Sequence, residues 1–131
     1  MRILLTEDDD SVRAFVSRAL ELDGHDVDTA CHGAEAIDRL EENEAGYDLL
    51  VTDVKMPIMD GIALAHEAAG KWPGMPILLM TGFADQRERA EDLAEKIRDV
   101  VTKPFTLQQI REAVSDAATG EDQAQKADRA A

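Results

Sequence analysis

The sequence has few of the residues that small proteins use to cross-link or anchor themselves. Cys31 is the one cysteine among 131 residues, so the chain can form neither an internal disulfide nor a cysteine-rich zinc site. Aromatic residues make up only 4% of the chain, too few to favour a flavin carrier, whose rings flank the cofactor. No apolar run approaches the ~20 residues of a membrane span, and no signal-peptide pattern opens the chain. We therefore expect a cytoplasmic protein.

Basic residues are also scarce. The chain has 14 Lys and Arg against 28 Asp and Glu, which gives a formal net charge of −14. A surface this negative repels phosphate backbones and anionic lipid headgroups. The charge therefore predicts binding to neither nucleic acid nor membrane. The length of 131 residues fits one domain that can bury a core without a structural metal.

Short apolar runs recur along the chain, separated by stretches with helical spacing. They are Ile3–Leu5, Leu49–Val51, Ile77–Met80 and Val100–Val101. Because the runs are continuous, they are typical of parallel strands covered on both faces. Residues 25–29 alternate polar and apolar instead, which predicts a half-exposed edge strand. Strands that alternate with helices predict an α/β fold with a five-stranded parallel sheet.

Five helices are predicted between and after these strands. The first covers about residues 10–23, with an apolar stripe formed by Val12, Phe15, Val16, Ala19 and Leu20. Gly24 ends this helix, and Asp9 and Asp10 are expected to cap it rather than to bind a metal. A second helix contains Ala34, Ile37 and Leu40, and a third runs from about Ile62 to just before Trp72.

The last two helices and the C-terminus are predicted from residues 84–131. Residues 84–95 are rich in charge, which predicts a weakly packed fourth helix. Thr106 and Gln109 form a capping box at the start of a strong fifth helix that ends at about residue 118. Residues 119–131 contain no large apolar side chain. We therefore expect a domain over 1–118 and a mobile tail over 119–131.

Polar residues follow the interior strands, at the point where each strand ends. They are Glu7 and Asp8, then Asp53, Thr81 and Lys103. The carboxyl ends of parallel strands form the ligand crevice of an open α/β sheet, so these residues are expected to converge there. Chance placement of acidic loop residues in so acidic a chain is the simpler alternative.

The residue types at this predicted crevice favour magnesium and phosphoryl chemistry. Three carboxylates held close together cannot all stay ionised without a counter-charge. Oxygen ligands suit Mg²⁺, and the absence of His and Cys from the set argues against zinc. Lys103 and Thr81 offer a positive charge and a hydroxyl donor to a phosphoryl group. Such a set is typical of a carboxylate that accepts a phosphoryl group as an acyl phosphate.

Four segments of the sequence resemble the response-regulator receiver domains of two-component signalling. The resemblance runs from Arg2 to about Ala118. Its segments are Ile3-Leu-Leu-Thr-Glu-Asp-Asp, Asp48-Leu-Leu-Val-Thr-Asp-Val-Lys-Met-Pro-Ile-Met-Asp-Gly61, Pro76-Ile-Leu-Leu-Met-Thr-Gly82 and Thr102-Lys-Pro-Phe105. It implies a doubly wound (βα)5 sheet of strand order 2-1-3-4-5, the flavodoxin-like order.

The resemblance also assigns roles to residues. It implies Asp53 as the phosphoacceptor, and Thr81 and Lys103 as contacts of the phosphoryl group. It further implies a Mg²⁺ site formed by Glu7, Asp8, Asp53 and the main-chain carbonyl of Lys55, together with a cis Lys103-Pro104 bond. The phosphoryl donor is then a histidine kinase or a histidine phosphotransferase, and the receiver is expected to be a monomer.

One position departs from the receiver pattern. Receivers usually carry Tyr or Phe three residues before the lysine, where the ring moves together with the threonine on activation. This chain has Val100 at that position. Phe83, two residues after Thr81, is a candidate substitute for the missing ring.

Three functions compete for this set of residues. We favour a signalling module that acts by protein binding and is not an enzyme in its own right. A Mg²⁺-dependent aspartyl phosphohydrolase would need a second Asp two residues after the nucleophile, where this chain has Lys55. A flavin carrier is disfavoured by the scarcity of aromatic residues.

Within the receivers, the chain resembles the small stand-alone CpdR-type cell-cycle regulators, which govern substrate delivery to the ClpXP protease. The segments Met80–Arg89 and Val100–Phe105 and the Ala130-Ala131 ending carry this resemblance. It implies a partner in a AAA+ protease component, with a phosphorelay shuttle or a regulator that binds another target as the alternatives. Cys31, beside the edge strand, is expected to be a small buried residue rather than a redox sensor.

Overall fold

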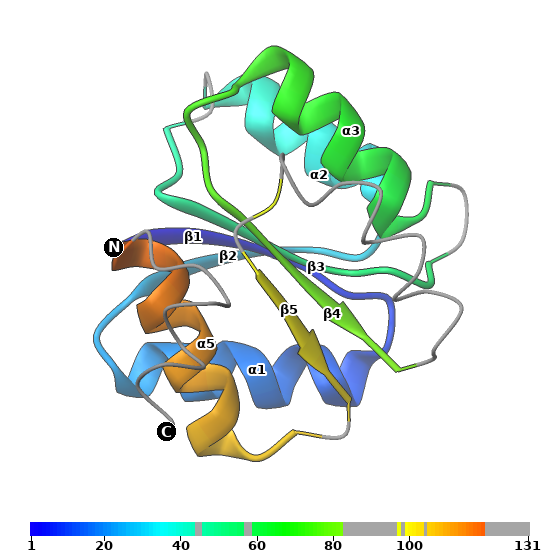
Figure 1. Ribbon diagram of the computed structural model, residues 1–131. Helices are drawn as coiled ribbons and strands as arrows, with labels where there is room; N and C mark the ends of the chain where they lie inside the picture. The colour runs from blue at the N-terminus through cyan, green and yellow to red at the C-terminus, as the bar shows by residue number, and fades with distance from the viewer. Residues whose placement is uncertain (44–45, 57–58, 83–96, 98, 104, 120–131) are drawn as a thin grey trace.

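The computed structural model describes residues 1–43, 46–56, 59–82, 97, 99–103 and 105–119, which form an α/β domain (Figure 1). Its strands are β1 (Arg2–Thr6), β2 (Asp26–Ala30), β3 (Leu49–Asp53), β4 (Ile77–Thr81) and β5 (Asp99–Thr102). They form one sheet of order β2-β1-β3-β4-β5, and every pairing is parallel. The predicted fold class and strand order are confirmed.

Within the described part of the chain, helices cover both faces of the sheet (Figure 1). On one face lie α1 (Asp10–Leu22) and α5 (Leu107–Thr119), and on the other lie α2 (Gly33–Glu42) and α3 (Gly61–Lys71). These four helices match the predicted first, second, third and fifth helices. The predicted fourth helix, Phe83, the cis Lys103-Pro104 bond and residues 120–131 of the predicted tail lie outside the described residues, whereas Thr119 is the last residue of α5.

The core has two halves because successive side chains of a strand point to opposite faces of the sheet. Ile3 and Leu5 of β1 pack with Val16 and Leu20 of α1, on the face that also carries α5. Leu4 points the other way, into the half that lies under α2 and α3. Every residue of β3 and β4 is buried, whereas β2 is only partly covered at the edge of the sheet. The predicted edge strand is therefore confirmed.

Side-chain caps fix where the described helices begin, including Asp60 ahead of α3. The Asp9 carboxylate accepts hydrogen bonds from the backbone N–H groups of Ser11 and Val12, so the expected cap is confirmed. Thr106 and Gln109 exchange the two bonds of a capping box ahead of α5, also as predicted. His32 Nδ1 caps α2 by accepting from Glu35 N. Gly24, with φ +85°, occupies the left-handed region just after α1, where it ends the helix.

Two burial predictions were wrong. The apolar stripe of α1 predicts a buried Phe15, yet this residue is 41% exposed, and its ring centroid lies 6.3 Å from that of Phe105. Cys31 was expected to be buried and is exposed. It comes directly after Ala30, the last residue of β2, and so lies beyond the covered part of the sheet. Among the described residues, no helix combines the length and apolar character needed to span a bilayer.

Candidate metal centre

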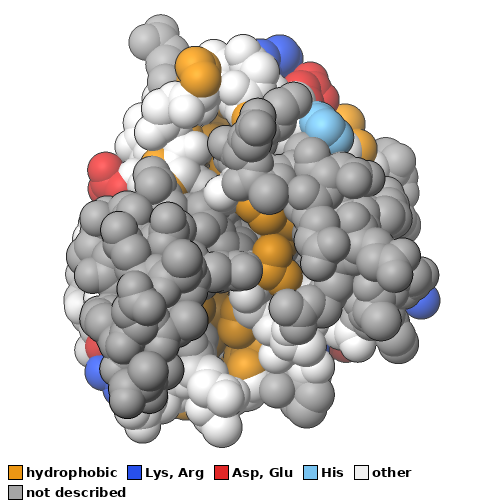
Figure 2. Space-filling view, in the orientation of Figure 1, with side chains coloured by type: hydrophobic (Ala, Val, Ile, Leu, Met, Phe, Trp, Pro, Cys, Tyr) orange, Lys and Arg blue, Asp and Glu red, His pale blue; other side chains and the backbone are white. Residues whose placement is uncertain are grey.

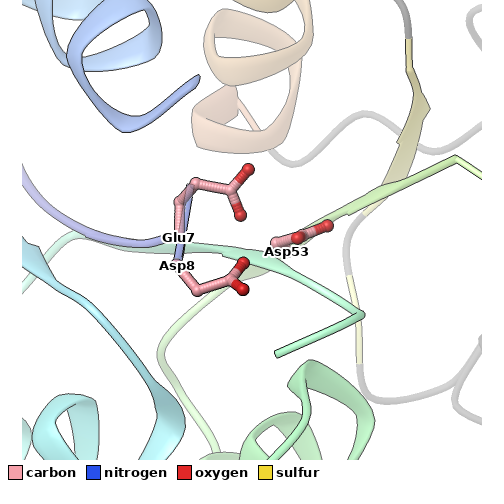
Figure 3. Close-up of side chains that lie close together, drawn as sticks. All are labelled: Glu7, Asp8 and Asp53. Carbon is pink, nitrogen blue, oxygen red and sulfur yellow. The ribbon is translucent and has the colours of Figure 1, made fainter. Parts of the chain in front are cut away.

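Three carboxylates converge at the carboxyl end of the sheet (Figure 3). Glu7 and Asp8 follow β1, and Asp53 ends β3, the neighbouring strand. One oxygen of each lies within 4.8 Å of the others. Parallel pairing explains the convergence, because the register of Thr6 with Thr52 brings the next residue of each strand to the same level. The predicted acidic set is therefore assembled as expected, and chance placement of acidic loops does not explain it.

Glu7 is the most buried member of the set, with no exposed surface. Its Oε1 accepts a hydrogen bond from Lys103 Nζ at 2.7 Å. Its Oε2 is also buried and has no hydrogen-bond partner among the described residues. Burial and the neighbouring Asp53 carboxylate raise the pKa of Glu7 to about 8, although the hydrogen bond and charge of Lys103 act in the opposite direction.

This oxygen set fits a hard divalent cation. A buried carboxylate oxygen without a partner loses its hydration without compensation. A bound cation would supply that compensation. Asp8 is exposed to solvent, so the site is open on one side and leaves room for waters or a further oxygen ligand. All the donor atoms are carboxylate oxygens, which favours Mg²⁺ over zinc.

Lys103 joins the acidic set to β5. Its Nζ lies 2.7 Å from Glu7 Oε1 and 3.2 Å from Asp53 Oδ1, and its backbone N–H donates to Thr81 O at 2.7 Å. Burial of the ammonium group opposes its charge, but the two carboxylates outweigh burial and raise the pKa of Lys103. The side chain is thus a fixed positive charge in contact with both buried carboxylates.

The backbone that follows Asp53 holds its carboxylate in place. Its Oδ1 accepts a hydrogen bond from Val54 N at 3.0 Å, and the residue is 6% exposed. The chain after Asp53 turns back toward α3, where Gly61 N donates to Val54 O at 2.8 Å. A Cβ on Gly61 would lie 2.0 Å from Asp53 O, so only glycine allows the helix to start this close to the strand.

The remaining predicted site residues flank this cluster. Thr81 is the buried last residue of β4, one residue beyond Met80, which pairs with Asp53. Lys55 follows β3 by two residues and has an exposed side chain. The structure therefore brings Glu7, Asp8, Asp53 and Lys103 into one cluster and puts Thr81 and Lys55 on the segments that border it.

Arg13 is a neighbour of the site that the sequence did not reveal. Its Nη1 donates to the main-chain oxygen of Glu7 at 2.9 Å. The spacing of Asp10 and Arg13 on one helix does predict an ion pair, which is present. Nothing in that spacing indicates that the guanidinium also reaches back to the end of β1.

Comparison with known proteins decides the family. The model of the response regulator receiver domain matches residues 3–115. The chain belongs to the response-regulator receiver family. Receivers act in two-component signalling and accept phosphoryl groups from histidine kinases or phosphotransfer proteins. They bind Mg²⁺ at an acidic pocket of this kind.

Three relatives illustrate the match. The response regulator receiver protein CpdR of Brucella abortus is 41% identical over 109 residues, which cover 83% of this chain and 89% of that protein. A receiver domain crystal structure from Clostridium thermocellum superposes with a TM-score of 0.82 at 28% identity, covering 90% of this chain and 94% of the other. TrrA of Thermotoga maritima, solved in complex with Mg²⁺ and beryllofluoride, superposes at 0.78 with 28% identity, covering 88% and 97%.

Proposed function

We propose that this receiver is phosphorylated on Asp53 in a Mg²⁺-dependent transfer and that phosphorylation controls its binding to another protein. The observation that carries the proposal is the contact of Lys103 Nζ with Asp53 Oδ1, at 3.2 Å, beside the converging oxygens of Glu7 and Asp8. One carboxylate thus lies between a positive charge and a cation site. That arrangement suits an acceptor of phosphoryl groups better than it suits a purely structural ion pair.

The transfer itself requires little of the protein beyond positioning and charge. An oxygen of the Asp53 carboxylate attacks the phosphorus, a P–O bond forms, and the P–N bond to the donor imidazole breaks. The leaving imidazole nitrogen keeps the electron pair and takes up a proton. The ammonium group of Lys103 pairs with the negative phosphoryl oxygens, and Thr81 donates its hydroxyl from the end of β4.

Glu7, Asp8, Asp53 and the Lys55 main-chain carbonyl would hold the metal. When bound, Mg²⁺ neutralises the carboxylates and withdraws charge from the phosphoryl oxygens. The fully buried Glu7 and the exposed Asp8 have different tasks in this proposal: Glu7 also anchors Lys103, whereas Asp8 faces the solvent side of the site.

Magnesium is expected to stabilise the fold, because it binds carboxylates that repel one another without it. At a free concentration about 100 times Kd the gain is about 2.7 kcal/mol, or roughly 10 °C in Tm. Asp8→Asn should lose most of this gain. Thermal unfolding in Mg²⁺ and in EDTA measures it.

The matched control for this experiment is Asp38→Asn, which removes the same charge from an exposed position on α2. It should keep the full stabilisation by Mg²⁺. Equal stabilisation of the Asp8→Asn and wild-type proteins would contradict the proposed metal site.

The downstream part of the proposal is a phosphorylation-controlled adaptor for a ClpXP-type protease in bacterial cell-cycle control. It is supported by the 41% identity to CpdR, which extends over 89% of that protein's length. The segments quoted for the CpdR-type resemblance support it as well. The unphosphorylated receiver binds the AAA+ component, and phosphorylation of Asp53 weakens the complex. The cytoplasmic location, the monomeric state and the division into a domain over 1–118 and a tail over 119–131 belong to the same proposal.

The adaptor proposal predicts two results. A pull-down with the purified AAA+ component should recover unphosphorylated receiver and several-fold less of the receiver loaded with beryllofluoride. Replacing both Ala130 and Ala131 by Asp should lengthen the lifetime of the receiver in cells and leave phosphorylation of Asp53 unchanged.

Failure of both results would favour a phosphorelay shuttle. In that case no protease subunit is recovered in either phosphorylation state, and the tail variant is degraded at the original rate. The phosphoryl group on Asp53 would then pass to a histidine phosphotransferase, which can be followed as loss of label from the receiver.

A further inference from the structure

We propose that Arg13 is a positioning residue for the cation site. Its guanidinium fixes the peptide group between Glu7 and Asp8, and so sets the direction in which the two metal-binding carboxylates project. This inference rests on the proposed function, since it concerns the same acidic site. In the contacts that the described residues show, the Arg13 side chain touches neither the carboxylates of the proposed metal ligands nor the phosphoacceptor.

The geometry begins with the first turn of α1. Arg13 N donates to Asp9 O at 2.9 Å, which is an ordinary helical bond. The side chain then folds back toward the end of β1, where Nη1 donates to Glu7 O at 2.9 Å. Nη2 forms an ion pair with Asp10 Oδ1. The Arg13 side chain is 20% exposed, so it is packed against the protein.

The backbone of Glu7 is consequently held at both of its polar groups. Its N–H donates to Ala30 O of β2 at 3.1 Å, and its carbonyl accepts from Arg13. The carbonyl oxygen belongs to the peptide group that links Glu7 to Asp8. With this peptide plane fixed, the Asp8 Cα is held in place, so the Asp8 side chain projects from a restrained backbone. Groups that hold metal ligands in this way govern metal affinity, although they do not touch the ion.

A guanidinium group is suited to this task. It is planar and carries donors on separate nitrogens, so it can bond Glu7 O and Asp10 at the same time. Asp10 is exposed and lies on the outer side of the turn, where it orients the guanidinium. A lysine ammonium is compact and offers its donors from one nitrogen. Lysine at position 13 would therefore keep the charge but hold the peptide less firmly.

The charge of Arg13 and its positioning role predict opposite changes in cation affinity when Arg13 is removed. Removing a positive charge near three carboxylates should by itself tighten the binding of a divalent cation. Loosening the Glu7–Asp8 peptide should weaken it, by about 10-fold according to the effect of comparable supporting contacts in other metal sites. The sign of the change in affinity therefore separates the two effects.

The experiment measures the Kd of Mn²⁺ for the full chain by electron paramagnetic resonance, which counts free ions directly. Arg13→Ala should bind Mn²⁺ about 10-fold more weakly than the wild type. The Kd of Arg13→Lys for Mn²⁺ should lie between those of the wild type and Arg13→Ala. Arg18→Ala removes the same charge from an exposed position on the same helix and should bind as tightly as the wild type, or more tightly. Circular dichroism in EDTA checks that each variant is folded.

Two results would overturn the assignment. One is Arg13→Ala binding as tightly as the wild type or more tightly, and the other is an equal weakening in Arg13→Ala and Arg18→Ala. If Arg13→Ala does not fold, Arg13→Lys decides, because wild-type affinity in that variant contradicts the positioning role. Absence of Mn²⁺ binding in the wild type would instead contradict the proposed metal site.

Discussion

Asp53→Asn is expected to abolish phosphorylation of this receiver. An amide oxygen is a far weaker nucleophile than a carboxylate oxygen, and the variant also removes one charge from the cation site. Wild-type protein with acetyl phosphate and Mg²⁺ should gain one phosphoryl group, and Asp53→Asn should gain none. Intact mass spectrometry measures both. Glu7 is not expected to replace Asp53 in this reaction, because Glu7 has no exposed surface.

Asp60→Asn is the matched control for this variant. Asp60 caps α3 by accepting a hydrogen bond from Ala63 N at 2.9 Å, and asparagine caps helices equally well. The control should be phosphorylated to the wild-type level. Phosphorylation of Asp53→Asn at the wild-type level would show that another residue is the acceptor.

Among the described glycines, Gly61 is expected to be the position where an added methyl group destabilises the fold most. The new Cβ would lie 2.0 Å from Asp53 O and 2.9 Å from Val54 Cα, and neither backbone atom can rotate away. Helix α3 must shift away from β3, at a cost of about 3 kcal/mol. The shift also moves the phosphoacceptor, so phosphorylation should be slower. Urea unfolding followed by the fluorescence of Trp72, which packs against the core, measures the loss of stability.

Gly70→Ala is the control, since it adds the same methyl group near the other end of α3. A Cβ on Gly70 would meet no atom within 4 Å. Alanine is a better helix former than glycine, so this variant should be more stable than the wild type by up to ~1 kcal/mol. A Gly61→Ala protein as stable as Gly70→Ala would show that α3 does not pack against β3 as closely as described.

The sequence predicted those parts of the fold that depend on local patterns. Continuous apolar runs located the buried strands β3 and β4, and alternation located β2 at the edge. Parallel strands place their carboxyl ends together, so the sequence alone assigns Glu7, Asp8, Asp53 and Lys103 to one site, as the structure shows. The strand order itself came from the resemblance to receivers and is confirmed.

Features that depend on three-dimensional packing could not be predicted in this way. The reach of Arg13 to the Glu7 carbonyl depends on how the chain turns between β1 and α1. The burial of Glu7, which raises its pKa to about 8, depends on elements far away in sequence. The exposure of Phe15 and Cys31 depends on where the covering helices end, and a one-dimensional apolar pattern does not contain that information.

Asp53, Lys103 and a cation held by Glu7 and Asp8 are proposed to form one phosphoryl-binding site. Fluorine NMR of the protein with beryllofluoride, a phosphoryl mimic, tests it most directly. Bound fluorine signals are expected in Mg²⁺, and they should disappear in EDTA and be absent from Asp53→Asn. Bound signals that persist in EDTA, or that are equally strong in Asp53→Asn, would contradict it.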